Sequence, residues 1–98
     1  GIRTFEAATR HTVDLSATPA LGAMTHLPNV VDPSHATGHA AMVKPMAVAA
    51  AAAGAGGLMI EVHNDPANAL CGGQQSQTPA QFADTMQAVQ AVLPFACR

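Results

Sequence analysis

Two short apolar runs, separated by an alanine-rich segment, most constrain the fold of this chain. The first run is "NVVD" at residues 29–32, and the second is "GLMIEV" at residues 57–62. Between them, from about Ala40, lies "AAMVKPMAVAAAAAG", whose many alanines favour a helix. A strand, a helix and a second strand in this order predict parallel strands joined by a crossover helix. The sequence therefore predicts an α/β fold, with residues 1–11 as the tail of a strand leading into a loop.

Proline, glycine and capping residues predict where the helices begin and end. Asp14 and Ser16 are candidate N-caps for a short helix through "SATPALGAM". In the alanine-rich helix, Pro45 predicts a kink or a late start near Val43, because proline lacks the N–H that a helix interior needs. Gly54 is well placed to end this helix.

The clearest helix start lies near the C-terminus, after a long polar loop at residues 63–77. Thr78 can act as N-cap, Pro79 can take the first helical position, and Gln81 can return the capping hydrogen bond. An apolar stripe at spacings of four, three and four then follows, formed by Phe82, Met86, Val89 and Leu93. We expect this helix to end near Pro94.

The composition indicates one small domain, residues 1–98, with a thin core. Hydrophobic residues make up 49% of the chain, but many are alanine and only 3% of residues are aromatic. Alanine buries little area. The charged fraction of 10% is also low, since soluble domains average roughly 25%. We therefore expect something else to cover part of the surface, and the initial glycine indicates a piece of a longer chain.

Charge and apolar pattern argue against several classes of function. Four basic and six acidic side chains give a formal charge of −2 without a basic patch, which argues against nucleic-acid binding. The longest apolar run, residues 46–60, is too short for a membrane span. Cys71 and Cys97 form no CxxC pair, and no signal-peptide pattern is present. These features predict reduced thiols in a cytoplasmic protein.

Polar side chains follow both predicted strands. Asp32, Ser34 and His35 come after the first strand, and Glu61 and His63 lie at the end of the second. In parallel α/β folds, functional groups gather at the carboxyl ends of the strands. If the two strands are neighbours, an imidazole and a carboxylate converge there. Such a set suits a divalent metal such as manganese, iron or zinc, with further ligands supplied from elsewhere.

Structural explanations compete with the metal site. A histidine at a strand end, such as His35, is more often a hydrogen-bonded structural residue than a ligand. Glu61 is harder to explain in this way, because a carboxylate inside an apolar run is costly if it is buried unpaired. His63 either braces the loop or orients a metal ligand through a hydrogen bond.

Two other kinds of site are weaker alternatives. Asp32, Ser34 and His35 are close enough for a Ser-His-Asp triad, but adjacent strand residues point to opposite faces and no nucleophile elbow is present. The glycines of "AVAAAAAGAGG" precede a strand rather than a helix, which is the wrong order for a phosphate loop. The remaining histidines have no partner pattern and are expected at the surface: His11, His26 and His39.

Four stretches of the chain resemble one known family: "GIRTFEAATRHTVDLSA", "LPNVVDPSHATG", "AGAGGLMIEVHNDPANAL" and "GGQQS". They resemble the C-terminal part of 3-deoxy-D-arabino-heptulosonate 7-phosphate (DAHP) synthase, in the shorter form called type I-beta. The resemblance covers essentially the whole chain in order, and its DPSHATG and MIEVHxDP blocks are highly specific. It implies a fragment of a (β/α)8 TIM barrel, covering roughly strands 7 and 8 with their helices.

The resemblance also implies a reaction, the metal-dependent condensation of phosphoenolpyruvate with erythrose 4-phosphate that begins the shikimate pathway. His35 and Glu61 would be two ligands of a manganese, iron, zinc or cobalt ion, beside a cysteine from an early strand and an aspartate from the last loop. The ion would polarise the aldehyde oxygen or activate a water. The substrate-binding Lys and Arg groups would come mostly from strands that this chain lacks.

This sequence departs from the family pattern at the last ligand. The loop reads "ALCGGQQS", so Gly72 stands where the metal-binding aspartate is expected. A Cys71 thiolate is a candidate substitute, although a displaced ligand rarely keeps the geometry. His39 and Ala40 replace the paired arginines that often follow the glycine of DPSHATG. These changes predict weakened metal binding.

Two hypotheses of different classes follow. The first is a C-terminal fragment of a DAHP synthase that is inactive alone. The second is a non-catalytic remnant that serves as an assembly or binding module, for which we expect a homo-oligomer that covers the open sheet edges. A related sugar-acid synthase acting on another aldose shares the fold and stays a third possibility.

Overall fold

Helices and strands alternate along the chain, which confirms the predicted α/β class. The computed structural model describes residues 2–97. The elements are α1 (Ala17–Met24), β1 (Val30–Val31), α2 (Pro33–Thr37), α3 (Ala40–Ala52), β2 (Gly57–Leu58) and α4 (Pro79–Val92). Two short 3₁₀ turns complete the chain, η1 (Pro66–Asn68) and η2 (Leu93–Phe95). Within residues 2–97, no helix is long and apolar enough to cross a membrane.

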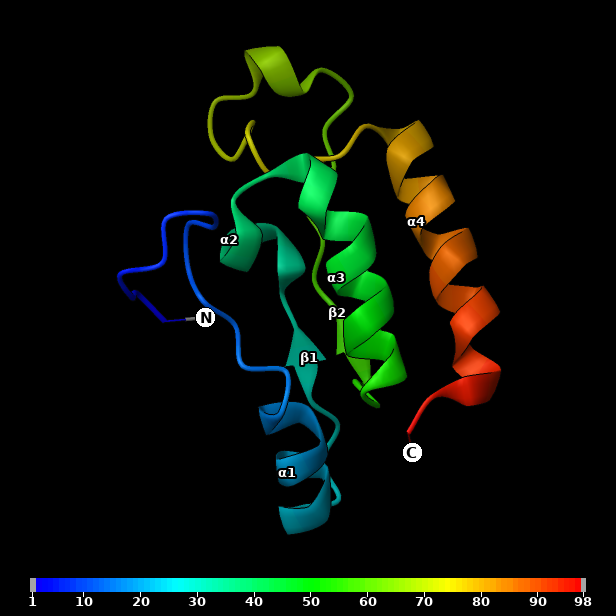
Figure 1. The fold of residues 1–98 in the computed structure, drawn as a ribbon. Helices are drawn as coiled ribbons and strands as arrows, with labels where there is room; N and C mark the ends of the chain where they lie inside the picture. Colours follow the sequence, from blue (N-terminus) through cyan, green and yellow to red (C-terminus); the bar gives the residue numbers. More distant parts are fainter. Residues whose placement is uncertain (1, 98) are drawn as a thin grey trace.

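The two strands are parallel neighbours, as the order of elements predicts. Val30 pairs with Gly57 and Val31 with Leu58, and both strands point toward α2 and the 63–77 loop (Figure 1). The ladder is shorter than the predicted strand at 57–62. It ends because α2 begins directly after β1, so that the Glu61 N–H donates to the Ser34 side-chain oxygen (3.0 Å) instead of a strand carbonyl.

The segment after β1 folds into a helix that the sequence analysis did not predict. In α2, Asp32 is the N-cap and its Oδ1 accepts a hydrogen bond from the His35 N–H at 2.9 Å. Pro33 occupies the first helical position, where no N–H is needed. Gly38 ends the helix with φ 71°. Ser34 and His35 therefore lie on a helical turn, which corrects their placement on a strand end.

The alanine-rich segment forms α3 with sharper limits than predicted. The late start near Val43 is wrong, because α3 begins at Ala40 and contains Pro45. Pro45 is exposed on the outer side of the helix, where water can satisfy the carbonyl that loses its N–H partner. Gly54 ends the helix as predicted, with φ 97°, and its N–H donates to the Ala51 carbonyl at 3.0 Å.

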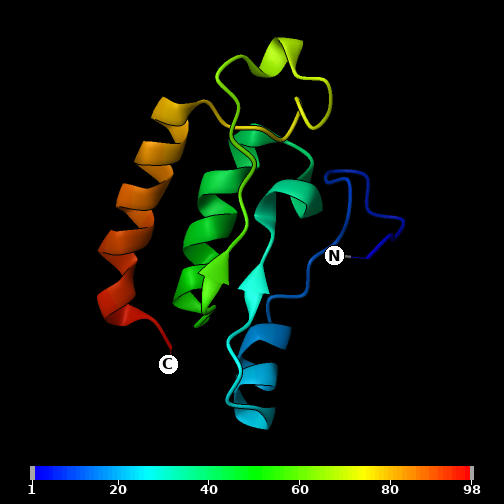
Figure 2. The same ribbon diagram turned by 180° about the vertical axis from the view of Figure 1, so that it is seen from behind.

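The N-terminal third has fewer partners than the rest. The strand tail predicted in residues 1–11 is reduced to one antiparallel bridge between Ile2 and Thr12, and residue 1 lies outside the described residues. At the start of α1, Asp14 Oδ1 accepts from the Ser16 N–H (2.9 Å), whereas Ser16 makes no capping bond with its side chain. Figure 2 shows α1 apart from α3 and α4, beyond the amino ends of the strands.

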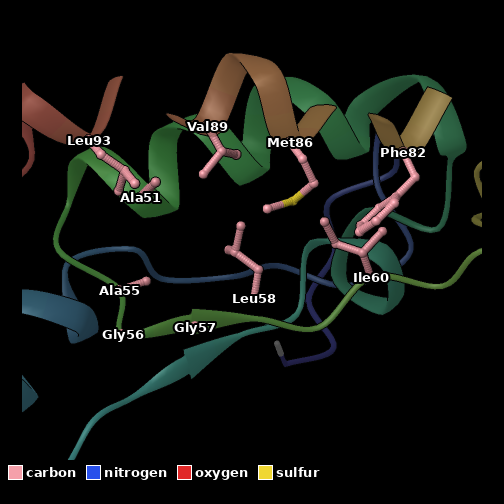
Figure 3. A pocket seen from close by; sticks show the side chains of 10 residues that line it. All are labelled: Ala51, Ala55, Gly56, Gly57, Leu58, Ile60, Phe82, Met86, Val89 and Leu93. Atoms are coloured by element: carbon pink, nitrogen blue, oxygen red, sulfur yellow. The ribbon is translucent and has the colours of Figure 1, made fainter. Parts of the chain in front are cut away.

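The core lies where α4 packs on α3 and on the β2 segment. Ala47, Ala51 and Val89 are its buried centre. The predicted stripe of α4 faces Leu58 and Ile60 across an apolar groove (Figure 3). Its stripe residues all line this groove: Phe82, Met86, Val89 and Leu93. The stripe therefore sets how α4 is oriented on the sheet.

The start of α4 is the most completely confirmed local prediction. Thr78 Oγ1 accepts from the Gln81 N–H (3.2 Å), and Gln81 Oε1 accepts from the Thr78 N–H (2.8 Å). Thr78→Ala removes one bond of this capping box and is expected to lower the free energy of unfolding by about 1 kcal/mol. Urea unfolding followed by circular dichroism measures this, with Thr78→Ser as the matched control that retains the hydroxyl.

Candidate functional site

Three polar side chains form a row at the carboxyl ends of the two strands. His35 Nδ1 lies 2.6 Å from Asp32 Oδ2, and His35 Nε2 lies 2.6 Å from Glu61 Oε1. The imidazole thus sits between two carboxylates, one on each ring nitrogen. The side chains are partly open to solvent, with 46% of His35, 31% of Asp32 and 30% of Glu61 exposed.

Helix α2 sets the direction of the His35 ring. Asp32 holds His35 twice, through the backbone N–H and through Nδ1, so the cap of the helix also fixes the imidazole. This orientation turns Nε2 toward the segment after β2, where Glu61 lies. The convergence of His35 and Glu61 expected from neighbouring strands is therefore present, although a helical turn rather than a strand end supplies the histidine.

Ser34 helps to hold Glu61 in the row of contacts and forms no nucleophilic triad. It is fully buried, and its hydroxyl oxygen accepts from the Glu61 N–H at 3.0 Å. The His35 ring is hydrogen-bonded to Asp32 through Nδ1 and contacts Glu61 through Nε2, and it does not contact the Ser34 hydroxyl in either way. This geometry fixes the backbone of Glu61 beside α2 and gives no support to the Ser-His-Asp alternative.

The loop after β2 returns to the site and holds the second oxygen of Glu61. Gln75 Nε2 lies 3.5 Å and Ser76 Oγ 3.4 Å from Glu61 Oε2. Gln75 and Ser76 are each only 4% exposed. From the sequence, both residues were expected only as part of a polar loop, without a contact to Glu61. A signal for them existed, because a carboxylate in an apolar run requires donors and "GGQQS" is a polar cluster in the loop that follows.

Gly72 leaves no room for a side chain beside Glu61. Its φ is 69°, a conformation that L side chains rarely adopt. A Cβ added there would lie 2.0 Å from Glu61 Oε2 and 3.0 Å from Glu61 Cδ. The carboxylate thus occupies the space that a side chain at position 72 would need.

The other candidate residues lie outside this row of contacts. His63 Nδ1 accepts from the Asp65 N–H at 2.9 Å, which agrees with the loop-bracing alternative. Cys71 is an exposed free thiol. His11, expected at the surface without a partner, is instead half-buried with Nδ1 3.4 Å from the His35 carbonyl oxygen. The segment around it runs beside α2 through the bond from the His11 N–H to the Ala36 carbonyl (2.8 Å).

The residues present do not fit a bound metal ion in this conformation. Among residues 2–97, no group of three or more His, Cys, Asp or Glu side chains is arranged to hold one. Asp32 and Glu61 lie on opposite edges of the His35 ring, so they do not surround a common centre. A ring nitrogen that donates to a carboxylate also has no lone pair to offer a metal.

The sequence matches one protein family over nearly its full length. The family model described as "DAHP synthetase I family" matches residues 1–93. A curated relative from Thermotoga maritima, "Phospho-2-dehydro-3-deoxyheptonate aldolase", is 48% identical over 87 residues. These residues are 89% of this chain and 26% of the relative, so the chain spans about a quarter of that protein.

Solved structures show the same fold. A truncated form of 3-deoxy-D-arabino-heptulosonate 7-phosphate synthase from Thermotoga maritima superposes with a TM-score of 0.92 at 45% identity. The match covers 96% of this chain and 36% of the other. A crystal structure of the aldolase (DAHP synthase) from the same organism also gives a TM-score of 0.92, covering 28% of its chain.

Proposed function

The chain belongs to the DAHP synthetase I family, and from this premise we propose that it is the C-terminal portion of a type I-beta synthase. In this proposal β1 is the seventh strand of the (β/α)8 barrel and β2 is the eighth. The DPSHATG block at the end of β1 and the IEVH block after β2 support the assignment. The parallel pairing of β1 with β2 agrees with consecutive strands of such a barrel.

We propose further that the whole cytoplasmic enzyme condenses phosphoenolpyruvate with erythrose 4-phosphate. The observation that carries this function is the meeting of His35 and Glu61 at the carboxyl ends of the strands, the edge where barrel enzymes place their active sites. In the whole enzyme, with the contact between them opened, His35 and Glu61 would be two ligands of a divalent metal, and the others would come from residues outside this row. The 98-residue chain alone, with two strands, is expected to be inactive.

A chimera tests this proposal directly. Residues 1–93 replace the matching part of the Thermotoga maritima enzyme, and consumption of phosphoenolpyruvate is followed with and without erythrose 4-phosphate in the presence of Mn²⁺. We expect low turnover that requires the aldose, because the rest of the barrel comes from the enzyme with the same fold. His35→Ala is expected to reduce it by at least about a hundredfold, in line with the loss of a group at a metal site.

His26→Ala is the matched control, since His26 is exposed and lies outside the row of contacts. It is expected to leave turnover unchanged. A folded chimera that shows no turnover, or that is equally active with and without the imidazole of His35, would contradict the proposal. It would favour the non-catalytic remnant, and sedimentation of the 98-residue chain would then show whether an oligomer forms.

A further inference from the structure

We propose that Gly72 is a positioning residue: it lets the Glu61 carboxylate lie directly against His35. The resulting His35–Glu61 pair then fills the position where a metal ion would bind. The mismatch between the contact row and a metal site motivates the inference. Both nitrogens of His35 face carboxylate oxygens at 2.6 Å. The imidazole of His35 and the carboxylate of Glu61 thus contact each other directly, with no ion between them.

The space between Gly72 and Glu61 is too small for a side chain. Glu61 Oε2 sits 2.0 Å from where a Cβ of residue 72 would be, far inside van der Waals contact. Any side chain at position 72 would therefore displace this carboxylate or the loop. Only glycine leaves the space free, and its φ of 69° lets the backbone turn close against Glu61 at little conformational cost.

Hydrogen bonds in the same turn also bear on Glu61. The Gly72 carbonyl accepts from the Ser76 N–H (3.0 Å) and from the Ser76 hydroxyl (2.6 Å). The hydroxyl has one proton, which the shorter contact takes, so the Gln75 amide is the donor left for Glu61 Oε2. The turn at Gly72 thereby makes room for the carboxylate and also brings it a buried donor.

The consequence is competition between the pair and a metal. An ion must first separate Glu61 from His35, so its apparent affinity falls in proportion to the fraction of molecules in which the pair is open. A side chain at position 72 would remove this competition by displacing Glu61. Gly72 thus acts through Glu61: by allowing the pair to form, it makes His35 Nε2 less available to a metal ion.

Proton and nitrogen NMR of the 98-residue chain tests the inference. The expected result is a slowly exchanging His35 Nε2–H signal in the wild type that disappears in Glu61→Gln and in Gly72→Asn, while the Nδ1–H beside Asp32 is retained. Asparagine is chosen because it tolerates a left-handed backbone better than other residues with a Cβ. Gly22→Ala is the matched control, since nothing lies within 4 Å of a Cβ at position 22, and it should retain the signal.

Titration with Co²⁺ supplies a second readout, which a merely structural role of Gly72 would not move in this direction. Paramagnetic broadening of His35 is expected at a Co²⁺ concentration at least about tenfold lower in Gly72→Asn than in the wild type, because a pair open in a tenth of molecules lowers the apparent affinity tenfold. Broadening of the wild type at equimolar Co²⁺, or equal titrations of both proteins, would overturn the inference.

The remaining outcomes are also decisive. A wild-type chain without the Nε2–H signal overturns the inference, whether the pair is open or the segment is unfolded. If Gly72→Asn loses its amide dispersion, the variant is unfolded and the wild type alone tests the inference. The wild type must then show the Nε2–H signal and must not be broadened by equimolar Co²⁺. The inference rests on the proposed function only in that both concern His35 and Glu61. If the chimera is inactive, the proposed function fails but the NMR result still stands. If NMR shows an open pair, this inference fails but the chimera can still be active.

Discussion

Replacing Gly72 with aspartate in the chimeric enzyme is expected to raise phosphoenolpyruvate consumption by at least about a hundredfold, since even the hydrogen-bonding partners of metal ligands are worth 10- to 100-fold. Two effects act together. The side chain displaces Glu61 Oε2, which lies 2.0 Å from the Cβ position, and so frees His35 Nε2. Under the proposed function, the new carboxylate would also supply the oxygen ligand that the resemblance implies at this position.

Gly72→Asn is the control that separates these two effects. Asparagine has nearly the same size and displaces Glu61 in the same way, but it brings an amide in place of a carboxylate. We expect Gly72→Asn to stay within about tenfold of the parent chimera. Equal rates for the aspartate and asparagine variants would show that the charge at position 72 contributes nothing to turnover.

The second large effect concerns stability. Val43→Asp is expected to unfold the 98-residue chain, because Val43 is fully buried in α3 and an unpaired charge buried there costs several kcal/mol. A small domain has a net stability of only about 5–15 kcal/mol. The thin alanine core of this chain places it at the lower end. Loss of the cooperative urea transition in circular dichroism measures the effect.

Val30→Asp provides the matched control on the neighbouring element β1. Val30 is 60% exposed, so the same substitution is expected to change the free energy of unfolding by less than about 1 kcal/mol. A cooperative transition retained by Val43→Asp would show that α3 is not packed as described. Together the two variants test whether the core is centred on α3 and α4 in the isolated chain.

The low charged fraction is reflected in a surface that exposes many apolar side chains. Phe5, Leu70 and Phe95 are 108%, 104% and 83% exposed, and the groove beside α4 is lined by apolar residues (Figure 3). Such surfaces are usually covered by another part of a protein or by a partner. The prediction that something else covers this chain is consistent with its match to about a quarter of a longer relative.

Features encoded within a few neighbouring residues followed from the sequence. The capping box at Thr78, the apolar stripe of α4 and the glycine stop at Gly54 each depend on contacts inside one helix or at its end. The parallel pairing followed from the order of elements, because a helix between two strands is the usual crossover connection of a parallel pair. Glu61 was also marked by the sequence, as a carboxylate within an apolar run.

The tertiary structure alone decided which loop residues contact Glu61. Gly72 and Gln75 lie in the loop after β2, so no periodicity reveals them, whereas the meeting with His35 was expected from neighbouring strand ends. The helix α2 was missed for a related reason, since five residues without an apolar repeat show no helical period and depend on the Asp32 cap. The sequence by itself determined which residue types reach the carboxyl ends of the strands. Only the packing of the Gly72 turn on Glu61 decided that histidine and carboxylate meet each other directly there.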